Sequence, residues 1–367
     1  MSEAFHIIIS GGGTGGHIFP AIAIANQIKS LYPQAEILFV GALGKMEMER
    51  VPAAGYTIIG LPVAGLQRKA LLKNLTLPYK LWKSVRLAKA VIEDFKPDVA
   101  VGVGGYASGP LLWVAARKGI PCLLQEQNSY AGITNKWLSK RAKRVCVAYE
   151  GMERFFPKEK ICLTGTSVRT HITPVTQTLN QEGRTFFKIT PHRKCILVLG
   201  GSLGARALNH CVKAYIEQCD VSPVDIIWQC GDYYREESYA FIKAHPRSWI
   251  HLHPFISRME LAFAAADVVI SRAGAGTVAE LCIAGKAVIF VPSPNVSEDH
   301  QTHNAMALVN KNAALLVPEN RVSDCLMTTA IDVANNHERR MTLEQNIAKL
   351  ARPFATRDIV HEIIKLI

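Results

Sequence analysis

The same local pattern opens each half of this chain: an apolar run, a turn crowded with glycine, and then a helix-like stretch. The first copy reads HIIISGGGTGGHIFPA and the second reads ILVLGGSLGARALN. Glycine lets the backbone turn sharply after a strand, and a continuous apolar run is typical of a strand buried on both faces of a parallel sheet. This start favours an α/β fold over every other class.

Apolar runs and helical patterns continue to alternate along the rest of the chain. We predict twelve strands, at residues 5–10, 35–40, 56–60, 98–103, 121–125, 144–149, 195–200, 224–229, 248–253, 267–271, 286–291 and 313–317. Repeated strand–helix units build doubly wound sheets, whose ligands bind at the carboxyl ends of the strands. We therefore expect two Rossmann-like domains in tandem, facing each other across a cleft.

The length of 367 residues also favours two domains. We place the first at residues 1–165, with a C-terminal helix at 353–367 packing back on it, and the second at 166–352. The first 166 residues carry 21 Lys and Arg against 11 Asp and Glu, whereas the remainder carries 21 against 19. This excess of positive charge indicates that the first half meets phosphates, nucleic acid or an acidic membrane surface.

The first glycine loop runs from Gly11 to Gly16 and is followed directly by His17. Its spacing satisfies G-x-G-x-x-G, but a dinucleotide site also wants an acidic residue after the second strand, where this chain has FVGALG. Loop amides at a helix N-terminus suit a phosphate. A histidine titrates near neutrality, as a general base requires, so His17 is a candidate base; a capping or packing histidine is the alternative.

Two later loops of the first half carry further signals. The segment 102–110, GVGGYASGP, is either a tight turn or a second phosphate-binding loop, and two such loops together favour a diphosphate. The segment 125–132, QEQNSYAG, follows a strand and could hydrogen-bond a sugar or simply be a solvated loop.

The second half repeats the arrangement. In the loop GGSLGAR, the hydroxyl of Ser202 could donate to a phosphate oxygen. In SRAGAGTVAE, Thr277 and the backbone of Ala275 and Gly276 would face a nucleotide diphosphate, and Glu280 could accept both hydroxyls of a ribose or serve only as a helix-dipole partner. The chain has no D-x-D, no H-E-x-x-H and no Cys/His quartet, so we expect neither a metal nor a cofactor.

Residues 66–90 contain seven Lys and Arg, no acidic residue, and interleaved Leu, Tyr and Trp. This mixture suits the interface of an anionic bilayer, although an amphipathic helix with a solvated face is the alternative. The candidates for membrane contact are Leu72, Leu75, Tyr79, Trp82, Lys83 and Trp113. RNA could use the same charge, but no RNA-binding signature accompanies it, so we expect no nucleic-acid partner.

The apolar runs, the first residues and the cysteines together predict where in the cell the protein lies. No apolar run is long enough to span a bilayer, and the start passes straight into a strand without a signal sequence. Nine scattered cysteines indicate a reducing compartment. We expect a cytoplasmic protein held peripherally on a membrane.

Taken together and in this order, GGGTGGH, EQNSYAG, GGSLGAR and SRAGAGTVAE resemble the MurG family, and the likeness extends to DHQTHNA at 299–305. These are undecaprenyldiphospho-muramoylpentapeptide β-N-acetylglucosaminyltransferases. The resemblance implies a GT-B fold and inverting transfer of GlcNAc from UDP-GlcNAc to the C4 hydroxyl of the muramoyl sugar of lipid I. It also implies attachment to the cytoplasmic face of the inner membrane and a role in cell-wall biogenesis, cell shape and cell division.

The resemblance further implies roles for individual positions. The donor-binding positions are Thr14, Gly15, Gly16, Asn128, Arg169, Ser202, Ile256, Ala275, Gly276, Thr277, Glu280 and Gln301, with Arg169 on the UDP diphosphate and the Ile256 backbone on uracil. The acceptor diphosphate would lie on Gly13, Thr14, Gly104, Gly105 and Tyr106. His17 is the expected base, with Glu126 in reserve. The chain departs from the family at Gln125, where His is frequent, and at Ser167, where Pro is common.

Two other hypotheses remain open at this point. A UDP-GlcNAc epimerase of the same fold would consume UDP-GlcNAc without a lipid acceptor and would not need the basic stretch. A non-enzymatic membrane-binding or RNA-binding protein would not be stabilised by UDP.

Overall fold

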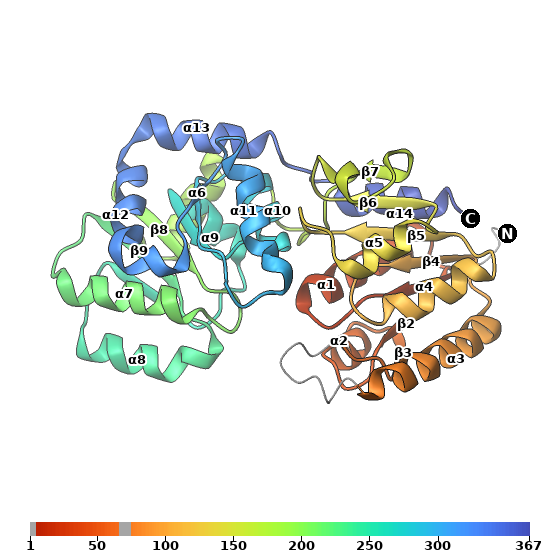
Figure 1. The fold of residues 1–367 in the computed structure, drawn as a ribbon. Coiled ribbons are helices and arrows are strands. Elements are labelled where there is room, and N and C mark those ends of the chain that lie inside the picture. The colour runs from red at the N-terminus through yellow and green to blue at the C-terminus, as the bar shows by residue number, and fades with distance from the viewer. Residues whose placement is uncertain (1–4, 66–74) are drawn as a thin grey trace. The chain divides into compact units, whose positions relative to one another are not determined.

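A computed structural model describes residues 5–65 and 75–367, which divide into two compact units. The first unit ends at Val168 and takes back the last residues, Phe354–Ile367; the second is Arg169–Pro353. Each unit is an α/β body with its own parallel sheet (Figure 1). The prediction of two Rossmann-like domains is confirmed.

The sheet of the first unit has seven strands in the order β3-β2-β1-β4-β5-β6-β7. The strands are β1 His6–Ser10, β2 Glu36–Ala42, β3 Thr57–Leu61, β4 Val99–Gly102, β5 Cys122–Glu126, β6 Arg144–Val147 and β7 Ile161–Leu163. All of the pairs are parallel; in the centre, Ile8 lies between Leu38 and Ala100. Both faces are covered, which explains why the strands are continuously apolar.

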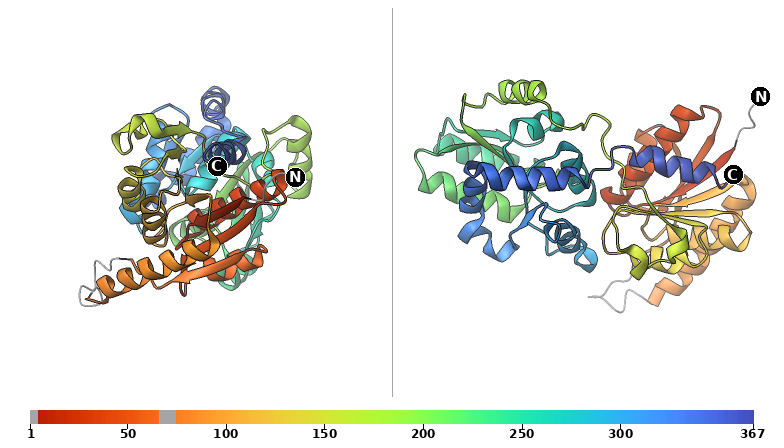
Figure 2. Two further views of the ribbon diagram at one scale, coloured as in Figure 1. Left: turned by 90° about the vertical axis from the view of Figure 1, so that its right-hand side faces the viewer. Right: turned by 90° about the horizontal axis from the view of Figure 1, so that it is seen from above.

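Helices cover the two faces of this sheet. They are α1 Gly15–Leu31, α2 Glu47–Ala53, α3 Leu77–Phe95, α4 Ser108–Arg117, α5 Ile133–Ser139 and α14 Ala355–Ile364. Side chains alternate along a strand, so Ile7 and Ile9 pack with α1, α2 and α14, whereas Ile8 packs with α3, α4 and α5. The C-terminal helix α14 lies against α1, as Figure 2 also shows.

The second unit has a six-stranded parallel sheet in the order β10-β9-β8-β11-β12-β13. Its strands are β8 Lys194–Leu199, β9 Val224–Gln229, β10 Ile250–His253, β11 Val268–Ser271, β12 Val288–Phe290 and β13 Leu315–Leu316. Its helices are α6 Gln177–Phe186, α7 Arg206–Gln218, α8 Arg235–Ala244, α9 Met259–Ala265, α10 Ala275–Ala284, α11 His300–Val309, α12 Val322–Asn335 and α13 His337–Ala348. The core centres on Trp228, which is fully buried.

Both sheets change direction of winding at one place. The chain order reverses between β1 and β4 in the first unit and between β8 and β11 in the second. The four loops that follow these strands are the glycine-rich segments singled out in the sequence. In doubly wound sheets such reversal points, at the carboxyl ends of the strands, are where ligands bind.

Each of the twelve predicted apolar runs overlaps an observed strand, whereas strand β7 and helix α6 were not predicted. Strand β7 has only three residues, too few to carry a pattern. Helix α6 lies inside the polar segment 164–194, for which the sequence analysis gave no element. It packs on α9 through Gly183, where a Cβ would overlap the Leu261 backbone.

Candidate functional site

The two glycine loops of the first unit touch each other. The Gly12 amide donates to the Gly104 carbonyl at 3.3 Å. A Cβ on Gly105 would overlap the Gly12 carbonyl, and Gly105 has φ +91°, a conformation that favours glycine. The loops after β1 and β4 therefore form one surface that only glycine permits.

His17 lies on this surface at the start of α1. Its Nδ1 is 3.1 Å from the Gly12 carbonyl oxygen and 3.3 Å from Thr14 Oγ1. Because a carbonyl oxygen only accepts hydrogen bonds, we assign the proton to Nδ1 and the lone pair to Nε2. A Cβ on Gly104 would lie 2.8 Å from Nε2, so the ring depends on glycine there for its place.

Glu47, which the sequence analysis did not single out, is completely buried beneath the first loop. Its Oε2 accepts the Gly13 amide at 2.9 Å, and its Oε1 accepts the Ala42 amide at 3.0 Å. A Cβ on Gly12 would overlap its carboxylate. No motif marks Glu47; the missing side chains at Gly12 and Gly41 are the only sequence trace of the space that it fills.

The polar cluster after β5 is organised around Glu126, which is 2% exposed. Its carboxylate accepts the amides of Asn128 and Gly132, each at 3.1 Å, and Nδ2 of Asn135 at 2.9 Å. These donors come from the loop that follows β5 and from α5. The arrangement holds Asn128, a predicted sugar contact, at the carboxyl end of the sheet.

Beside Glu126, Gln125 and Gln127 are also buried and hydrogen-bond each other. Gln127 donates to the Val103 carbonyl at 2.8 Å, which ties this cluster to the second glycine loop. Tyr106 in that loop is 52% exposed, and a Cβ on Gly65 would overlap its ring.

In the second unit, α10 begins in open space. A Cβ on Gly274 or on Gly276 would meet no atom within 4 Å. Gly274 has extended backbone before the helix, and Ala275, Gly276 and Thr277 form its first turn. Uncapped amides at an open helix N-terminus are suited to an anion.

Arg169 and Glu280, predicted to bind two parts of one ligand, contact each other here. Arg169 Nε donates to Glu280 Oε1 at 2.7 Å, and Nη2 donates to Oε2. Burial by itself would lower the pKa of Arg169, but hydrogen bonding and the charge of Glu280 raise it overall. The pair is a bidentate ion pair, with the carboxylate buried and the guanidinium partly exposed.

The loop after β8 is held by Gln229, a second residue that the sequence analysis missed. Gln229 Nε2 donates to the Gly201 carbonyl at 2.9 Å, and its Oε1 accepts the Ile256 amide at 3.1 Å. Ser202 is exposed at the tip of this loop. The Ile256 amide, part of the backbone expected to read uracil, is thus engaged by Gln229 in this structure.

Two residues near the start of α11 hold two different loops, the one after β12 and the one before α10. Gln301 Oε1 accepts the Ser293 amide at 2.9 Å, which leaves its amide nitrogen as the group for a ligand. Asn304 is buried and donates to the Ala273 carbonyl at 3.2 Å, just before α10.

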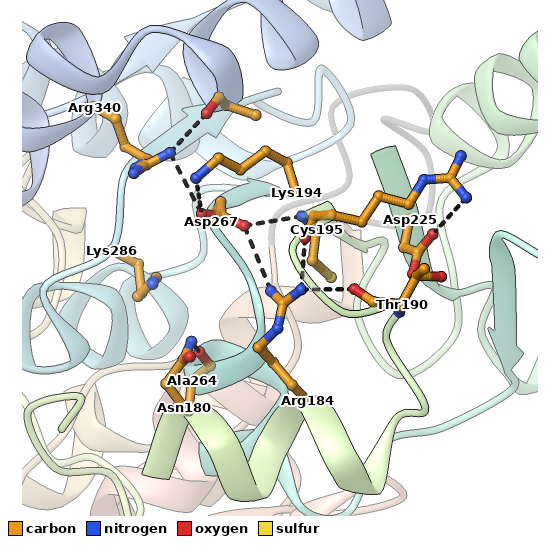
Figure 3. Close-up of polar contacts among 12 residues, drawn as sticks. Asn180, Arg184, Thr190, Lys194, Cys195, Asp225, Ala264, Asp267, Lys286 and Arg340 are labelled. Atoms are coloured by element: carbon orange, nitrogen blue, oxygen red, sulfur yellow. Dashed lines mark hydrogen bonds and ion pairs between the residues drawn. The ribbon is translucent and has the colours of Figure 1, made fainter. Parts of the chain in front are cut away.

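The opposite end of the second sheet carries a different kind of cluster (Figure 3). Asp267, directly before β11, is within ion-pair distance of Arg184, Lys194 and Arg340, the closest nitrogen being Lys194 Nζ at 3.3 Å. These residues tie α6 and α13 to the amino-terminal ends of the strands. The cluster therefore fixes helices rather than forming part of the glycine-loop surface.

Helix α3 presents the predicted membrane residues. Leu75, just before the helix, is 77% exposed, Tyr79 is 64% exposed and Trp82 is 58% exposed, while Lys83 is also exposed. Trp113 on the neighbouring α4 is only partly exposed, with the Arg117 guanidinium 4.8 Å from its ring centre. Leu72 lies outside the described residues. In the part of the chain that is described, no helix has the length and apolar character needed to cross a bilayer.

The chain matches two models of known families. The glycosyltransferase family 28 N-terminal domain matches residues 7–147, and the glycosyltransferase family 28 C-terminal domain matches residues 195–362. The matched segments contain all four glycine-rich loops described above.

Curated relatives cover the whole chain. A protein of Parabacteroides distasonis is 52% identical over 99% of this chain and 98% of its own length, and one of Phocaeicola vulgatus is 54% identical over 100% and 97%. Both are named UDP-N-acetylglucosamine–N-acetylmuramyl-(pentapeptide) pyrophosphoryl-undecaprenol N-acetylglucosamine transferase.

Solved structures agree with this. The crystal structure of Acinetobacter baumannii MurG has a TM-score of 0.80 at 31% identity and covers 98% of this chain and 99% of its own. A UDP-N-acetylglucosamine 2-epimerase structure has a TM-score of 0.62 at 12% identity, covering 99% of this chain and 96% of its own, a likeness of fold alone.

Proposed function

Because the chain belongs to the MurG family of glycosyltransferases, we propose that it transfers N-acetylglucosamine from its UDP donor to the C4 hydroxyl of the muramoyl sugar of undecaprenyl-diphospho-N-acetylmuramoyl-pentapeptide. This converts lipid I to lipid II and so completes the lipid-linked peptidoglycan precursor. The observation that carries the proposal is the identity of about half of all residues over the full chain to transferases named for this reaction.

The second unit is the proposed donor site. The open N-terminus of α10, with Ala275, Gly276 and Thr277, is suited to the UDP diphosphate. The hydroxyl of Ser202, which is exposed at the tip of its loop, is a second hydrogen-bond donor for the diphosphate. The Ile256 carbonyl would meet uracil, and the Gln301 amide would meet the sugar hydroxyls.

Donor binding would require the ion pair between Arg169 and Glu280 to separate. In our proposal the guanidinium turns to the diphosphate while the carboxylate accepts the two ribose hydroxyls. Both groups then exchange one set of charge-assisted hydrogen bonds for another, so the buried carboxylate of Glu280 keeps its donors. We expect the exchange to make donor binding specific for a ribose that carries a diphosphate.

The first unit is the proposed acceptor site. The Gly12 and Gly13 amides already donate to Gly104 and Glu47, so the acceptor diphosphate would use the amides from Thr14 to Gly16 at the start of α1, together with those of Gly105 and Tyr106. Thr14, Gly15 and Gly16 would also border the donor sugar, with Asn128 on its hydroxyls.

The reaction we propose is a single displacement at C1 of N-acetylglucosamine. The proton of the C4 hydroxyl passes to His17 Nε2, and the oxygen bonds to C1 on the face opposite UDP. The C1–O bond to UDP breaks and its electron pair leaves on the diphosphate, so the configuration inverts. Backbone amides, Thr277 and Arg169 stabilise that charge. Glu126 is fully occupied with its own loop, which favours a positioning role for it and leaves His17 as the base.

An anionic membrane surface is the proposed second partner of the first unit, on the cytoplasmic side of the inner membrane. Around Trp82, the exposed apolar side chains stand next to Lys83, Arg86 and Lys89, which are also exposed. Aromatic rings at the headgroup level and cations on anionic lipids are the usual elements of such contacts. This would hold the enzyme where its lipid-linked acceptor lies.

The test of the function is transfer of labelled N-acetylglucosamine from UDP-N-acetylglucosamine to a lipid I analogue. We expect product only with both substrates present, and His17→Ala to reduce turnover by about 10²- to 10⁴-fold while the thermal shift caused by UDP stays unchanged. Consumption of the donor without acceptor would indicate the epimerase instead. Unchanged turnover of His17→Ala would remove His17 as the base.

The membrane contact has a separate test in vesicles that contain anionic lipid. Leu75→Glu combined with Trp82→Glu should reduce binding, while Tyr233→Glu, at an exposed aromatic position of the second unit, should not. If both variants bind as the unmodified protein does, the contact lies elsewhere.

A further inference from the structure

One peptide group links His17 to the buried carboxylate of Glu47. The Gly12 carbonyl and the Gly13 amide belong to the same peptide bond. The carbonyl oxygen is 3.1 Å from His17 Nδ1, and the amide nitrogen is 2.9 Å from Glu47 Oε2. The three groups form a continuous hydrogen-bonded line from carboxylate to imidazole.

The space around Glu47 is arranged to admit a carboxylate. The side chain is completely buried, and none of the ion pairs found among the described residues involves it. A Cβ on Gly41 would lie 2.6 Å from its Cγ, and one on Gly12 would overlap its oxygens. Among residues 5–65 and 75–367, the hydrogen bonds to its carboxylate come from the amides of Ala42 and Gly13, and burying a carboxylate in this way is costly.

We propose that Glu47 is a positioning residue that acts on His17 through the Gly12–Gly13 peptide group. The inference rests on the proposed role of His17 as the base. Hydrogen bonds in a chain polarise one another, so a carboxylate on the amide makes the carbonyl a stronger acceptor for Nδ1–H. This fixes the tautomer whose lone pair is on Nε2 and stabilises the imidazolium that forms when the acceptor's proton arrives.

The arrangement differs from the aspartate–histidine contact of serine hydrolases by one interposed peptide group. Its advantage here is geometric, because the same carboxylate also fixes the loop on which the acceptor diphosphate would rest. A single buried charge thus orients both the base and the backbone beside it.

The first test is Glu47→Gln, which keeps the size of the side chain but removes its charge. Its NH2 group would also face one of the two backbone amides that now donate to the carboxylate. The matched control is Glu49→Gln, an exposed glutamate of the same helix. We expect kcat to fall about 10- to 100-fold in Glu47→Gln with an unchanged KM for UDP-N-acetylglucosamine, and no change in the control. A kcat within twofold of the unmodified enzyme would overturn the proposal.

The second test asks whether Glu47 works through His17. In a double-mutant cycle, Glu47→Gln added to His17→Ala should change turnover by less than about twofold, because residues that act as a unit are not additive. Multiplication of the two losses would mean general damage and would overturn the inference. His17→Ala with normal turnover would instead overturn the proposed base, so the two failures are distinct.

A third measurement uses the unmodified protein, so it does not depend on whether a variant folds. In the unmodified protein with ¹⁵N-labelled histidine, the nitrogen shifts of His17 should report a protonated Nδ1 and an unprotonated Nε2 above neutral pH. The opposite tautomer would overturn the inference.

Discussion

The loops that follow β1 and β8 occupy equivalent places in two sheets of the same topology, yet side chains of opposite polarity hold them. In the first unit, Glu47 accepts the amide of Gly13. In the second unit, Gln229 donates to the carbonyl of Gly201. Glu47 lies in α2, after the neighbouring strand β2, and Gln229 is the last residue of the neighbouring strand β9. The two loops are thus held from corresponding neighbouring strands by groups of different chemistry.

This difference separates two uses of the same motif. Where an amide is bound from below, the carbonyl of that peptide faces a donor, and Gly12 can orient His17. Where a carbonyl is bound from below, as at Gly201, the amide of the same peptide, that of Ser202, points to the opposite side. The polarity of the group beneath such a turn therefore decides which side of its peptide, carbonyl or amide, is turned away from the sheet.

The largest expected effect is that of Gly12→Ala. A Cβ there would displace the Glu47 carboxylate and, with it, the Gly12–Gly13 peptide that orients His17. Because a misplacement of about 1 Å can cost 10²-fold in rate, we expect transfer to fall at least that much. In the control Gly109→Ala, the new Cβ would be 3.7 Å from its nearest neighbour, and activity should persist. A folded, fully active Gly12→Ala would break the contrast between the loops.

A second, smaller effect comes from placing beneath the loop after β8 the kind of charge that lies beneath the loop after β1. Gln229→Glu would place a carboxylate against the Gly201 carbonyl and close to the proposed diphosphate. We expect UDP affinity to fall about tenfold, in line with ~1–4 kcal/mol for like charges a few ångströms apart. Calorimetric titration with UDP measures this.

The control for that substitution is Gln218→Glu, which adds the same charge at an exposed position of α7. It should leave UDP binding within twofold of normal. Equal affinity in both variants would mean that the charge beneath the loop is irrelevant to donor binding.

The sequence predicts the loops but not what holds them. Gly12, Gly104 and Gly201 each follow a strand. Both the apolar strand and the glycine-rich turn can be recognised locally, because each depends on the residue types of its own segment. Glu47 lies 34 residues from the peptide that it orients, in a short helix without a motif. Only the pairing of β1 with β2 brings it there, and no local pattern encodes that distance.

The proposed donor site shows the same limit of prediction from the sequence. The family resemblance implies one ligand for Arg169 and Glu280, but it does not indicate that the two side chains pair with each other. Helix α6 was missed because its packing depends on a bare backbone at Gly183, and a glycine normally counts against a helix. Long-range contacts and close approach decide both cases.

Gly276→Ala sharpens the contrast between a filled and an open glycine. Its Cβ would meet nothing, and alanine in place of glycine in a helix stabilises by up to about 1 kcal/mol, so the melting temperature should hold or rise. The methyl group would occupy space offered to the diphosphate, so KM for UDP-N-acetylglucosamine should rise several-fold at constant kcat. Steady-state kinetics and thermal melting together check this; an unchanged KM would place the diphosphate elsewhere.

The smallest expected effect concerns the stability of the second unit in mild acid. Burial, and then the charge of His251, lower the pKa of His253 in the second unit below its ordinary value of 6.5. Below that pH the unfolded chain binds more protons than the folded unit, so the free energy of unfolding falls as the pH drops from about 7 toward 5. Hydrogen exchange at pH 7.5 and 5.5 should show added opening in peptides around β10. His253→Phe should reduce that change, because it removes the proton that unfolding takes up, whereas exposed His210→Gln should not. Equal acid sensitivity of His253→Phe and the unmodified protein would assign the effect to other groups.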